Sequence, residues 1–188
     1  MTTKLSSFIT QMIEAIISSK TRIKLLLKFF LNSSTTAYLR SLESEFGDSS
    51  NAIRVELNRL EKAGMLTTRL NGNKKIFQAN TNHPLFNELH NILLKHVGFD
   101  RIVENVVHRL GDVEKVFVIG DFSRGLDSSI IDLIFIGKVD REYLLGLISK
   151  SEDVINRKIR YLVYSVKEYE DLDKKIFDPD PLLLWTKS

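Results

Sequence analysis

The strongest constraint on the fold of this chain is a pattern of two helices, a tight turn and a basic hairpin within residues 33–80. Along residues 36–46, apolar side chains recur at the spacing of one helical face: Tyr38, Leu39, Leu42 and Phe46. Gly47 follows, at a position where helices commonly end in a left-handed residue. Residues 48–51 then offer side chains that cap the start of a helix. We therefore predict two consecutive helices joined at Gly47.

The second of these helices has an apolar side and a polar side. Its expected buried residues are Ile53, Leu57 and Leu60, whereas another face holds Ser50, Asn51, Arg54 and Asn58. A hairpin is expected next, because Asn71-Gly72 separates two strand-like runs and is the strongest short-range hairpin signal. The basic residues that line this hairpin are Arg69, Lys74 and Lys75.

The stretch from Ser50 to Leu66 closely resembles the recognition helix of bacterial winged helix-turn-helix transcriptional regulators of the ArsR/MarR type. The resemblance covers about residues 18–98 and implies that this helix enters the major groove of double-stranded DNA, with the hairpin as the wing. Asn and Arg read base edges there, and a basic hairpin can reach phosphates. The expected DNA contacts are Ser50, Asn51, Arg54, Asn58, Arg69, Lys74 and Lys75. Because winged helices also serve as protein-binding modules, a protein–protein adaptor is an alternative.

Charge is distributed unevenly along the 188 residues. Residues 1–98 hold 13 Lys and Arg against 7 Asp and Glu, a balance of +6, whereas residues 99–188 hold 14 against 17, a balance of −3. The first half is therefore the part suited to a polyanion. The absence of cysteine excludes disulfides and thiolate metal sensors. Without a signal-peptide layout or an apolar run of membrane-spanning length, we expect a cytoplasmic protein with no membrane partner.

Helical patterns flank the central segment on both sides. Residues 5–17 carry an apolar stripe at helical spacing, and residues 20–31 supply Ile23, Leu26, Leu27 and Phe30 to the core. Pro84 suits the first turn of a helix that Gly98 ends, with an apolar side made of Leu85, Leu89, Ile92, Leu93 and Val97. The stripe over residues 5–17 either packs on the core or pairs with another subunit. With the helix after Pro84, it favours a homodimer.

The second half alternates between helices and strands. Helices are expected over residues 100–110, 140–158 and 167–175, and strands over residues 115–119, 130–136, 159–165 and 182–185. This order predicts an α/β domain in which helices cover a small mixed sheet. The predicted fold class is therefore α+β, with a winged helix-turn-helix domain over residues 1–98 and an α/β domain over residues 99–188.

The loop from Ile119 to Gly125, followed by the strand that contains Asp132, resembles the nucleotidyltransferase superfamily. In active members a Gly-Ser pair on the loop precedes a strand with two carboxylates one residue apart, and a later strand adds a third. These carboxylates hold two divalent metals that clamp the reacting oxygens of phosphoryl transfer. Here Asp121 stands at the serine position and Ile130 at the first carboxylate position, and the strand over residues 159–165 has no carboxylate.

The resemblance therefore supports the fold more than the activity. We expect no catalytic residue, no metal and no cofactor, and a vestigial nucleotidyltransferase site made of Gly120, Asp121, Arg124 and Asp132. Residues 120–125 could cradle a phosphate through backbone N–H groups, which leaves room for an unknown small-molecule or anionic effector. The interpretation is a DNA-binding transcriptional regulator with an inactive sensing or assembly domain. The alternative enzyme is a metal-dependent nucleotidyltransferase whose winged helix binds nucleic acid.

Overall fold

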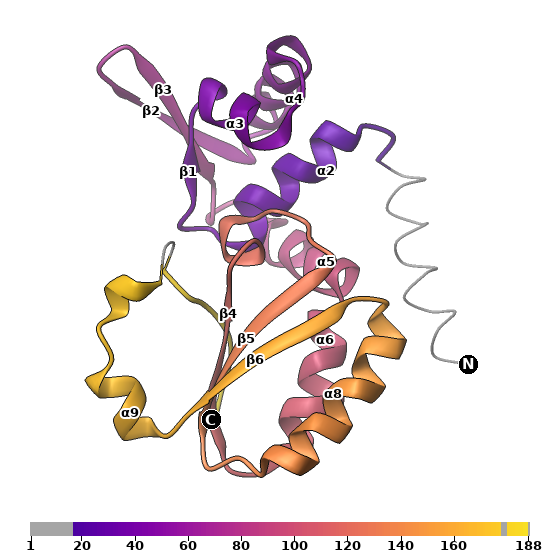
Figure 1. The fold of residues 1–188 in the computed structure, drawn as a ribbon. Helices are drawn as coiled ribbons and strands as arrows, with labels where there is room; N and C mark the ends of the chain where they lie inside the picture. Colours follow the sequence, from indigo (N-terminus) through magenta and orange to yellow (C-terminus); the bar gives the residue numbers. More distant parts are fainter. Residues whose placement is uncertain (1–16, 178–179, 188) are drawn as a thin grey trace. The chain divides into compact units, whose positions relative to one another are not determined.

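The computed structural model describes residues 17–177 and 180–187, drawn in colour in Figure 1. Contacts divide the chain into two compact units, whose described parts are residues 17–93 and 94–187. Each unit combines helices with one small sheet, so the predicted α+β class is confirmed at that level. The apolar stripe predicted over residues 5–17 lies outside the described residues, except for Ile17. Within the described residues, no helix combines the length and the apolar character that crossing a membrane requires.

Residues 17–93 contain a helical layer and a three-stranded antiparallel sheet in the order β1-β3-β2. The elements are α2 (Lys20–Leu26) with a π-helical turn (Leu27–Leu31), β1 (Thr36–Ala37), α3 (Leu39–Phe46), α4 (Ser50–Lys62), β2 (Leu66–Asn71) and β3 (Lys74–Ala79). Strands β2 and β3 form a hairpin that extends past α3 and α4 (Figure 1). Helix α5 (Phe86–Val97) follows.

The turn between α3 and α4 forms where the sequence predicts it. Gly47 ends α3 with φ +68°, in the left-handed region that glycine adopts without steric cost. The Ser49 hydroxyl caps α4 by accepting a hydrogen bond from the Ala52 N–H. The predicted start of the first helix is wrong, because Thr36 and Ala37 form strand β1 paired with β3. Pairing with a neighbouring strand outweighs the helical periodicity at these two positions.

The core of this unit determines which side of α4 faces solvent. Ile53 and Leu57 are at most 1% exposed and Leu60 is 6% exposed, as predicted from their spacing. They pack in a core that also contains Leu25, Phe29, Phe30 and Leu42. Burying each large apolar side chain stabilises the fold by about 1.5–3 kcal/mol, so α4 cannot rotate without losing several such contributions.

Two details around the hairpin and α5 differ from expectation. Asn71 pairs with Lys74, so the loop consists of Gly72 and Asn73, and Gly72 has φ +57° at the first loop position. On the predicted apolar side, Leu93 and Val97 are 1% exposed, whereas Leu85 and Ile92 are 59% and 43% exposed. Phe86 faces the core in their place, with its ring centroid 5.8 Å from that of Phe30. An aromatic ring buries more area than Leu85 would, which decides the rotation of the helix.

Residues 94–187 surround a four-stranded sheet in the order β6-β5-β4-β7. The elements are α6 (Phe99–Ile102), a π-helical turn (Val103–Val107), α7 (His108–Leu110), β4 (Val113–Ile119), a 3-10 turn (Phe122–Arg124), β5 (Ile130–Gly137), α8 (Arg141–Ile155), β6 (Lys158–Tyr164), α9 (Val166–Asp171), a second 3-10 turn (Lys174–Ile176) and β7 (Leu182–Thr186). Among the described strands β5 and β6 pair in parallel and the other pairs of this sheet are antiparallel, so the predicted mixed sheet is confirmed. The helix predicted over residues 167–175 is shorter, because Leu172 is extended and ends α9.

The two faces of this sheet differ in their covering. Residues Ile131, Leu133 and Phe135 of β5 are at most 1% exposed, and Figure 1 shows α6 and α8 on one side of the sheet and α9 on the other. Tyr169 of α9 stacks on Phe117 with ring centroids 5.4 Å apart. Because Phe117 lies opposite Ile134, this is the face that also carries Asp132.

Candidate functional site

The polar side of α4 is exposed as the sequence predicts. The predicted contact residues of α4 are exposed, away from its buried row: Ser50, Asn51, Arg54 and Asn58. Ser50, Arg54 and Asn58 are four residues apart, so they form one row along the helix. Within the described residues, Arg54 has no carboxylate partner and its guanidinium is available to a ligand.

A groove of about 550 Å³ lies between the start of α3, α4 and the tip of the β2–β3 hairpin. The charged residues that line it are Arg40, Arg54, Lys74 and Lys75, with the amides of Asn58 and Asn73, and no carboxylate lines it. The structure thus brings four predicted contacts to one concave surface: Arg54, Asn58, Lys74 and Lys75. Ser50, Asn51 and Arg69 are exposed but lie outside its lining.

Sequence reasoning missed Arg40 as a member of this surface. Arg40 lies in the first turn of α3 and is exposed, and it forms no ion pair among the described residues. The signal was present, because Arg40 is the only basic residue between Thr36 and Phe46 and lies off the apolar stripe. Its importance follows only from the position of α3 beside the hairpin.

The two adjacent lysines of the hairpin have different surroundings. The Lys74 ammonium lies 4.5 Å from the centroid of the Tyr38 ring. The Lys75 ammonium instead donates a 2.7 Å hydrogen bond to the Glu61 carboxylate on α4, whose other oxygen accepts from Thr68 at 3.0 Å. The hydrogen bond from Lys75 is the main reason that the pKa of Glu61 lies below its ordinary value.

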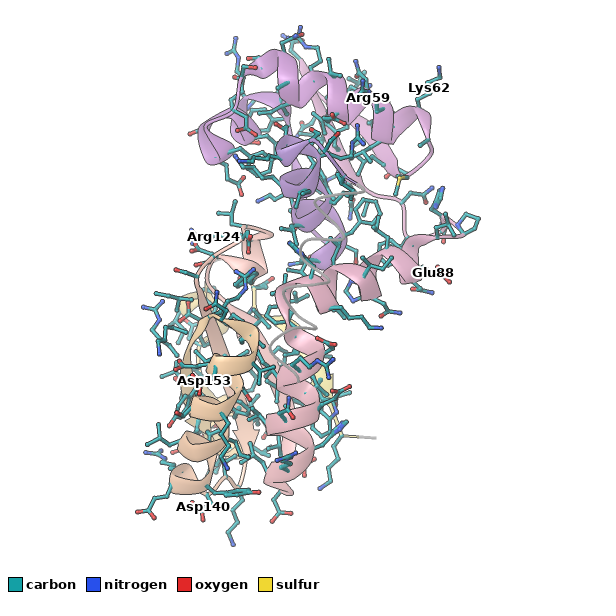
Figure 2. The ribbon with its side chains drawn as sticks, turned by 90° about the vertical axis from the view of Figure 1, so that its right-hand side faces the viewer. Arg59, Lys62, Glu88, Arg124, Asp140 and Asp153 are labelled. Carbon is teal, nitrogen blue, oxygen red and sulfur yellow. The ribbon has the colours of Figure 1, made fainter. Side chains whose placement is uncertain are left out.

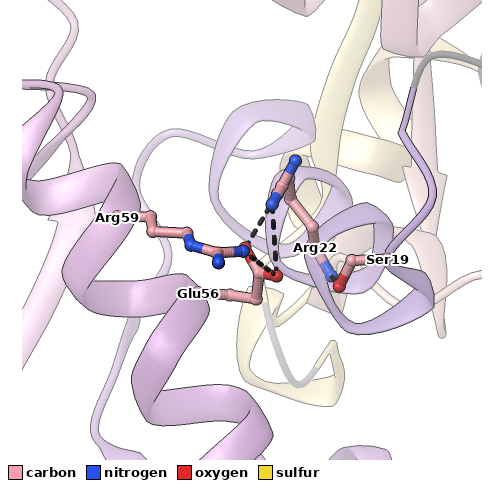
Figure 3. Close-up of polar contacts among 4 residues, drawn as sticks. All are labelled: Ser19, Arg22, Glu56 and Arg59. Carbon is pink, nitrogen blue, oxygen red and sulfur yellow. Dashed lines mark hydrogen bonds and ion pairs between the residues drawn. The ribbon is translucent and has the colours of Figure 1, made fainter.

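A buried carboxylate fixes α4 against α2, as Figure 3 shows. Glu56 is 5% exposed and accepts a hydrogen bond of 2.7 Å from Arg22 Nε and one of 3.1 Å from Arg59. Burial opposes ionisation of Glu56, but hydrogen bonds from Arg22 and Ser19 and the charges of both arginines outweigh it, so the pKa of Glu56 is lowered. Arg59 is thereby turned toward Glu56 and does not line the groove. Figure 2 labels Arg59 and Lys62 on α4.

A second ionic contact holds the turn that precedes α4. Asp48 accepts hydrogen bonds from Thr21 and Lys24, each 2.8 Å long. Lys24 also donates to the carbonyl of Phe46 at 2.9 Å, at the end of α3. The hydrogen bond from Lys24 is the main cause of the lowered pKa of Asp48. The start of α4, with Ser50 and Asn51, is therefore held in a defined orientation relative to α2.

The predicted nucleotidyltransferase-like site contains a closed ion pair. Asp132 of β5 and Arg160 of β6 lie at the same register position in parallel neighbouring strands. Arg160 donates two hydrogen bonds to the Asp132 carboxylate, 2.6 Å and 2.9 Å long. These bonds, together with the charges of Asp132 and Asp121, raise the pKa of Arg160. On the later strand, where an active nucleotidyltransferase would carry its third carboxylate, this chain has a cation.

Gly120 lies directly against this pair. It has φ +68°, and a Cβ added there would lie 2.8 Å from Asp132 Oδ2, so a side chain would clash. The structure thus brings Gly120 and Asp132 together, whereas Asp121 and Arg124 occupy exposed positions of the loop (Figure 2 labels Arg124). Arg160 was missed from sequence, because its pairing depends on the register between β5 and β6.

Several hydrogen-bond donors of the loop between β4 and β5 already donate to carbonyl groups of the same loop. Ser123 is fully buried and donates to the Gly120 carbonyl at 2.8 Å. The N–H groups of Arg124, Gly125 and Leu126 donate to carbonyls of residues 120–122. The phosphate cradle predicted over residues 120–125 therefore lacks two of its donors, the N–H groups of Arg124 and Gly125.

Among the described residues, no group of three His, Cys, Asp or Glu side chains could hold a metal ion. No protein-family model matches the chain, and neither a curated protein nor a solved structure matches it. The functional interpretation therefore depends on the geometry of the groove and of the Asp132–Arg160 pair.

Proposed function

We propose that residues 17–93 are a winged helix-turn-helix that binds double-stranded DNA, with α4 as the recognition helix and the β2–β3 hairpin as the wing, in a protein that regulates transcription. The observation that carries this proposal is a groove that no carboxylate lines and in which three cationic side chains, Arg40, Arg54 and Lys74, form no ion pair among the described residues. A polyanion gains most from cations that have no carboxylate partner, because each phosphate that they neutralise releases a counterion.

The positions of the side chains support a division of roles. Arg54 and Asn58 lie on the exposed row of α4, where side chains of these types can hydrogen-bond to base edges in the major groove. Arg40 and Lys74 flank them on α3 and on the hairpin, where they are placed to contact phosphates. Ser50 and Asn51 begin α4, and its first N–H groups offer further donors to a phosphate.

Two arginines of the same helix provide a matched test. Arg54→Ala should weaken binding to the specific site by about 1–3 kcal/mol if Arg54 reads a base. Arg59→Ala also removes an arginine side chain from α4, but one that is turned toward Glu56, so it should leave DNA affinity nearly unchanged. Fluorescence anisotropy with a labelled duplex selected from genomic fragments, with mixed-sequence duplex as the reference, measures both variants.

The outcome separates DNA binding from a protein–protein adaptor. A regulator binds duplex with an affinity that falls steeply as salt rises, and Arg54→Ala reduces the preference for the selected site. Weak binding that does not depend on salt, or equal effects of the two substitutions, would contradict the placement of the interface. The adaptor would then be the better interpretation.

For residues 94–187 we propose a nucleotidyltransferase-like domain that transfers no nucleotide and serves sensing or assembly. Its support is the pairing of its one matching carboxylate, Asp132, with Arg160. A carboxylate held by a guanidinium at two points cannot also hold two divalent metals. An active enzyme that uses the winged helix to bind nucleic acid is the alternative, and metal-dependent turnover would favour it.

We also propose a homodimer, since two winged helices would read the two halves of a palindromic operator. Leu85 and Ile92 are exposed, and they are seven residues apart on one side of α5 and the turn before it. Such a side can pair with its own copy about a two-fold axis. Light scattering at micromolar concentration should give twice the chain mass, and Ile92→Glu should shift it toward the monomer. A wild-type mass of 21.6 kDa would exclude this dimer.

A further inference from the structure

The wing carries two adjacent lysines whose charges are not equally available. Lys74 and Lys75 are consecutive residues of β3, so their side chains leave the strand in opposite directions, yet both residues line the groove. Within the described residues, the Lys74 ammonium lies over the Tyr38 ring and forms no ion pair with a carboxylate. Lys75 has a carboxylate at 2.7 Å, that of Glu61, and the Phe77 ring centroid at 5.2 Å.

Glu61 is held in place independently of Lys75. It lies in the last turns of α4, and Thr68 of β2 donates to its Oε1 while Lys75 of β3 donates to its Oε2. One carboxylate therefore joins the recognition helix to both strands of the hairpin. Because Thr68 fixes the carboxylate beside Lys75, the anion remains close to the ammonium when another anion approaches.

We propose that Glu61 masks Lys75 from DNA, so that Lys74 supplies the phosphate contact of the wing while Lys75 positions the hairpin on α4. This inference rests on the proposed DNA-binding function. Its physical reason is that Lys75 already has a counter-charge within the protein. The Lys75–Glu61 pair has no net charge, so a phosphate beside it is not neutralised and keeps its condensed counterion, and it also meets the negative charge of Glu61.

The salt dependence of DNA binding distinguishes a masked lysine from a free one. The probe is a fluorescently labelled, mixed-sequence duplex titrated with the full chain between about 50 and 200 mM potassium chloride. Each phosphate contact contributes about 0.9 to the slope of log K against log salt. A substitution that acts only on structure lowers the affinity without changing this slope.

Four variants together test whether Glu61 masks Lys75. Lys74→Met should reduce the slope by about 0.9, because it removes a phosphate contact, whereas its matched partner Lys75→Met should leave the slope unchanged. Glu61→Gln keeps the size of the side chain and removes its charge, so it should unmask Lys75 and increase the slope by up to about 0.9. The double variant Glu61→Gln with Lys75→Met should return to the wild-type slope.

The pattern also shows how the inference would fail. A slope reduced by Lys75→Met as much as by Lys74→Met would mean that Lys75 contacts phosphate despite Glu61. An unchanged slope in Glu61→Gln would mean that Lys75 does not face DNA at all. Either result overturns the masking. Wild-type protein that binds no duplex overturns the proposed function itself.

Folding of the variants is checked by thermal unfolding. The Glu61–Lys75 pair is exposed at its lysine end, and exposed ion pairs contribute little to stability, so all four variants should remain folded. A variant with a lowered melting temperature is titrated with DNA at a temperature where it is fully folded. Its slope of log K against log salt then tests the masking as for the other variants.

Discussion

Both units contain an arginine–carboxylate pair, but the pair is buried between helices in one unit and lies on an exposed sheet face in the other. In residues 17–93, Glu56 is buried between α2 and α4, and Arg54 stays without a carboxylate on the exposed side of α4. In residues 94–187, Asp132 and Arg160 pair on the sheet face, with the Arg160 side chain 68% exposed. There the charges that could bind an anion or a metal neutralise each other. The placement of charges, more than their number, decides which surface keeps cations without carboxylate partners.

The carboxylates of residues 17–93 serve mainly to join its elements. Glu45 pairs with Lys28, Asp48 with Lys24 and Glu56 with Arg22, and each of these pairs links α2 or the π-helical turn after it to α3, to α4 or to the turn between them. No acidic residue lines the groove, whose charged residues are all cationic. Cations without a carboxylate partner therefore remain where α4 and the hairpin meet.

The largest expected effect comes from removing the buried carboxylate of residues 17–93. Glu56→Ala leaves Arg22 without its partner in a half-buried position and should lower the free energy of unfolding by about 2–3 kcal/mol. Asp132→Ala removes the partner of an exposed arginine and should cost clearly less. Hydrogen exchange of α4 and of β5 in urea measures each unit separately. Equal losses would contradict the contrast between the two pairs.

The same comparison has a pH dependence with a defined sign. Glu56 has a folded-state pKa below its ordinary value of 4.5, so its stabilisation is complete above that value and is lost as the pH falls through the folded pKa. Glu56→Gln should therefore flatten the loss of stability of residues 17–93 in acid. An unchanged acid transition in this variant would mean that Glu56 is not the group responsible.

A smaller effect is expected at Gly120, where φ is +68°. Gly120→Ala adds a left-handed alanine, at about 1–2 kcal/mol, and also a contact with Asp132. Gly47 has the same φ and nothing within 4 Å of an added Cβ, so Gly47→Ala measures the backbone cost alone. Urea unfolding followed by Trp185 fluorescence should show a larger loss for Gly120→Ala than α4 hydrogen exchange shows for Gly47→Ala. Adding Asp132→Ala to Gly120→Ala should remove the excess.

The sequence predicts best what depends on local chemistry. The turn at Gly47, the hairpin after Asn71-Gly72 and the buried row of α4 follow from glycine conformation, turn residues and helical spacing. The errors arise where distant segments meet. Strand β1 exists because Thr36 and Ala37 pair with β3. The contact of Phe86 with Phe30 likewise joins segments that are far apart in the sequence.

The same limit applies to the candidate sites. Exposure of Arg54 and Asn58 follows from the period of one helix, so it could be predicted. The contact of Lys75 with Glu61 joins β3 to α4, and that of Arg160 with Asp132 depends on the register of two strands. Neither contact has a signature in a local stretch of sequence. Both decide whether a charge that looks available in the sequence remains available in the folded protein.

For nucleotide transfer we expect no measurable activity: residues 94–187 should transfer no nucleotide. Labelled ATP, CTP, GTP or UTP with magnesium or manganese should give no turnover on protein or nucleic-acid acceptors, because Asp132 is held by Arg160 and the described residues contain no three-carboxylate group. Arg160→Ala frees Asp132 but adds no carboxylate, so it should not create activity. Turnover that disappears in Asp132→Asn would contradict the inactive domain and favour the enzyme. DNA binding should remain unchanged in Asp132→Asn, because that substitution leaves every cation of the groove in place.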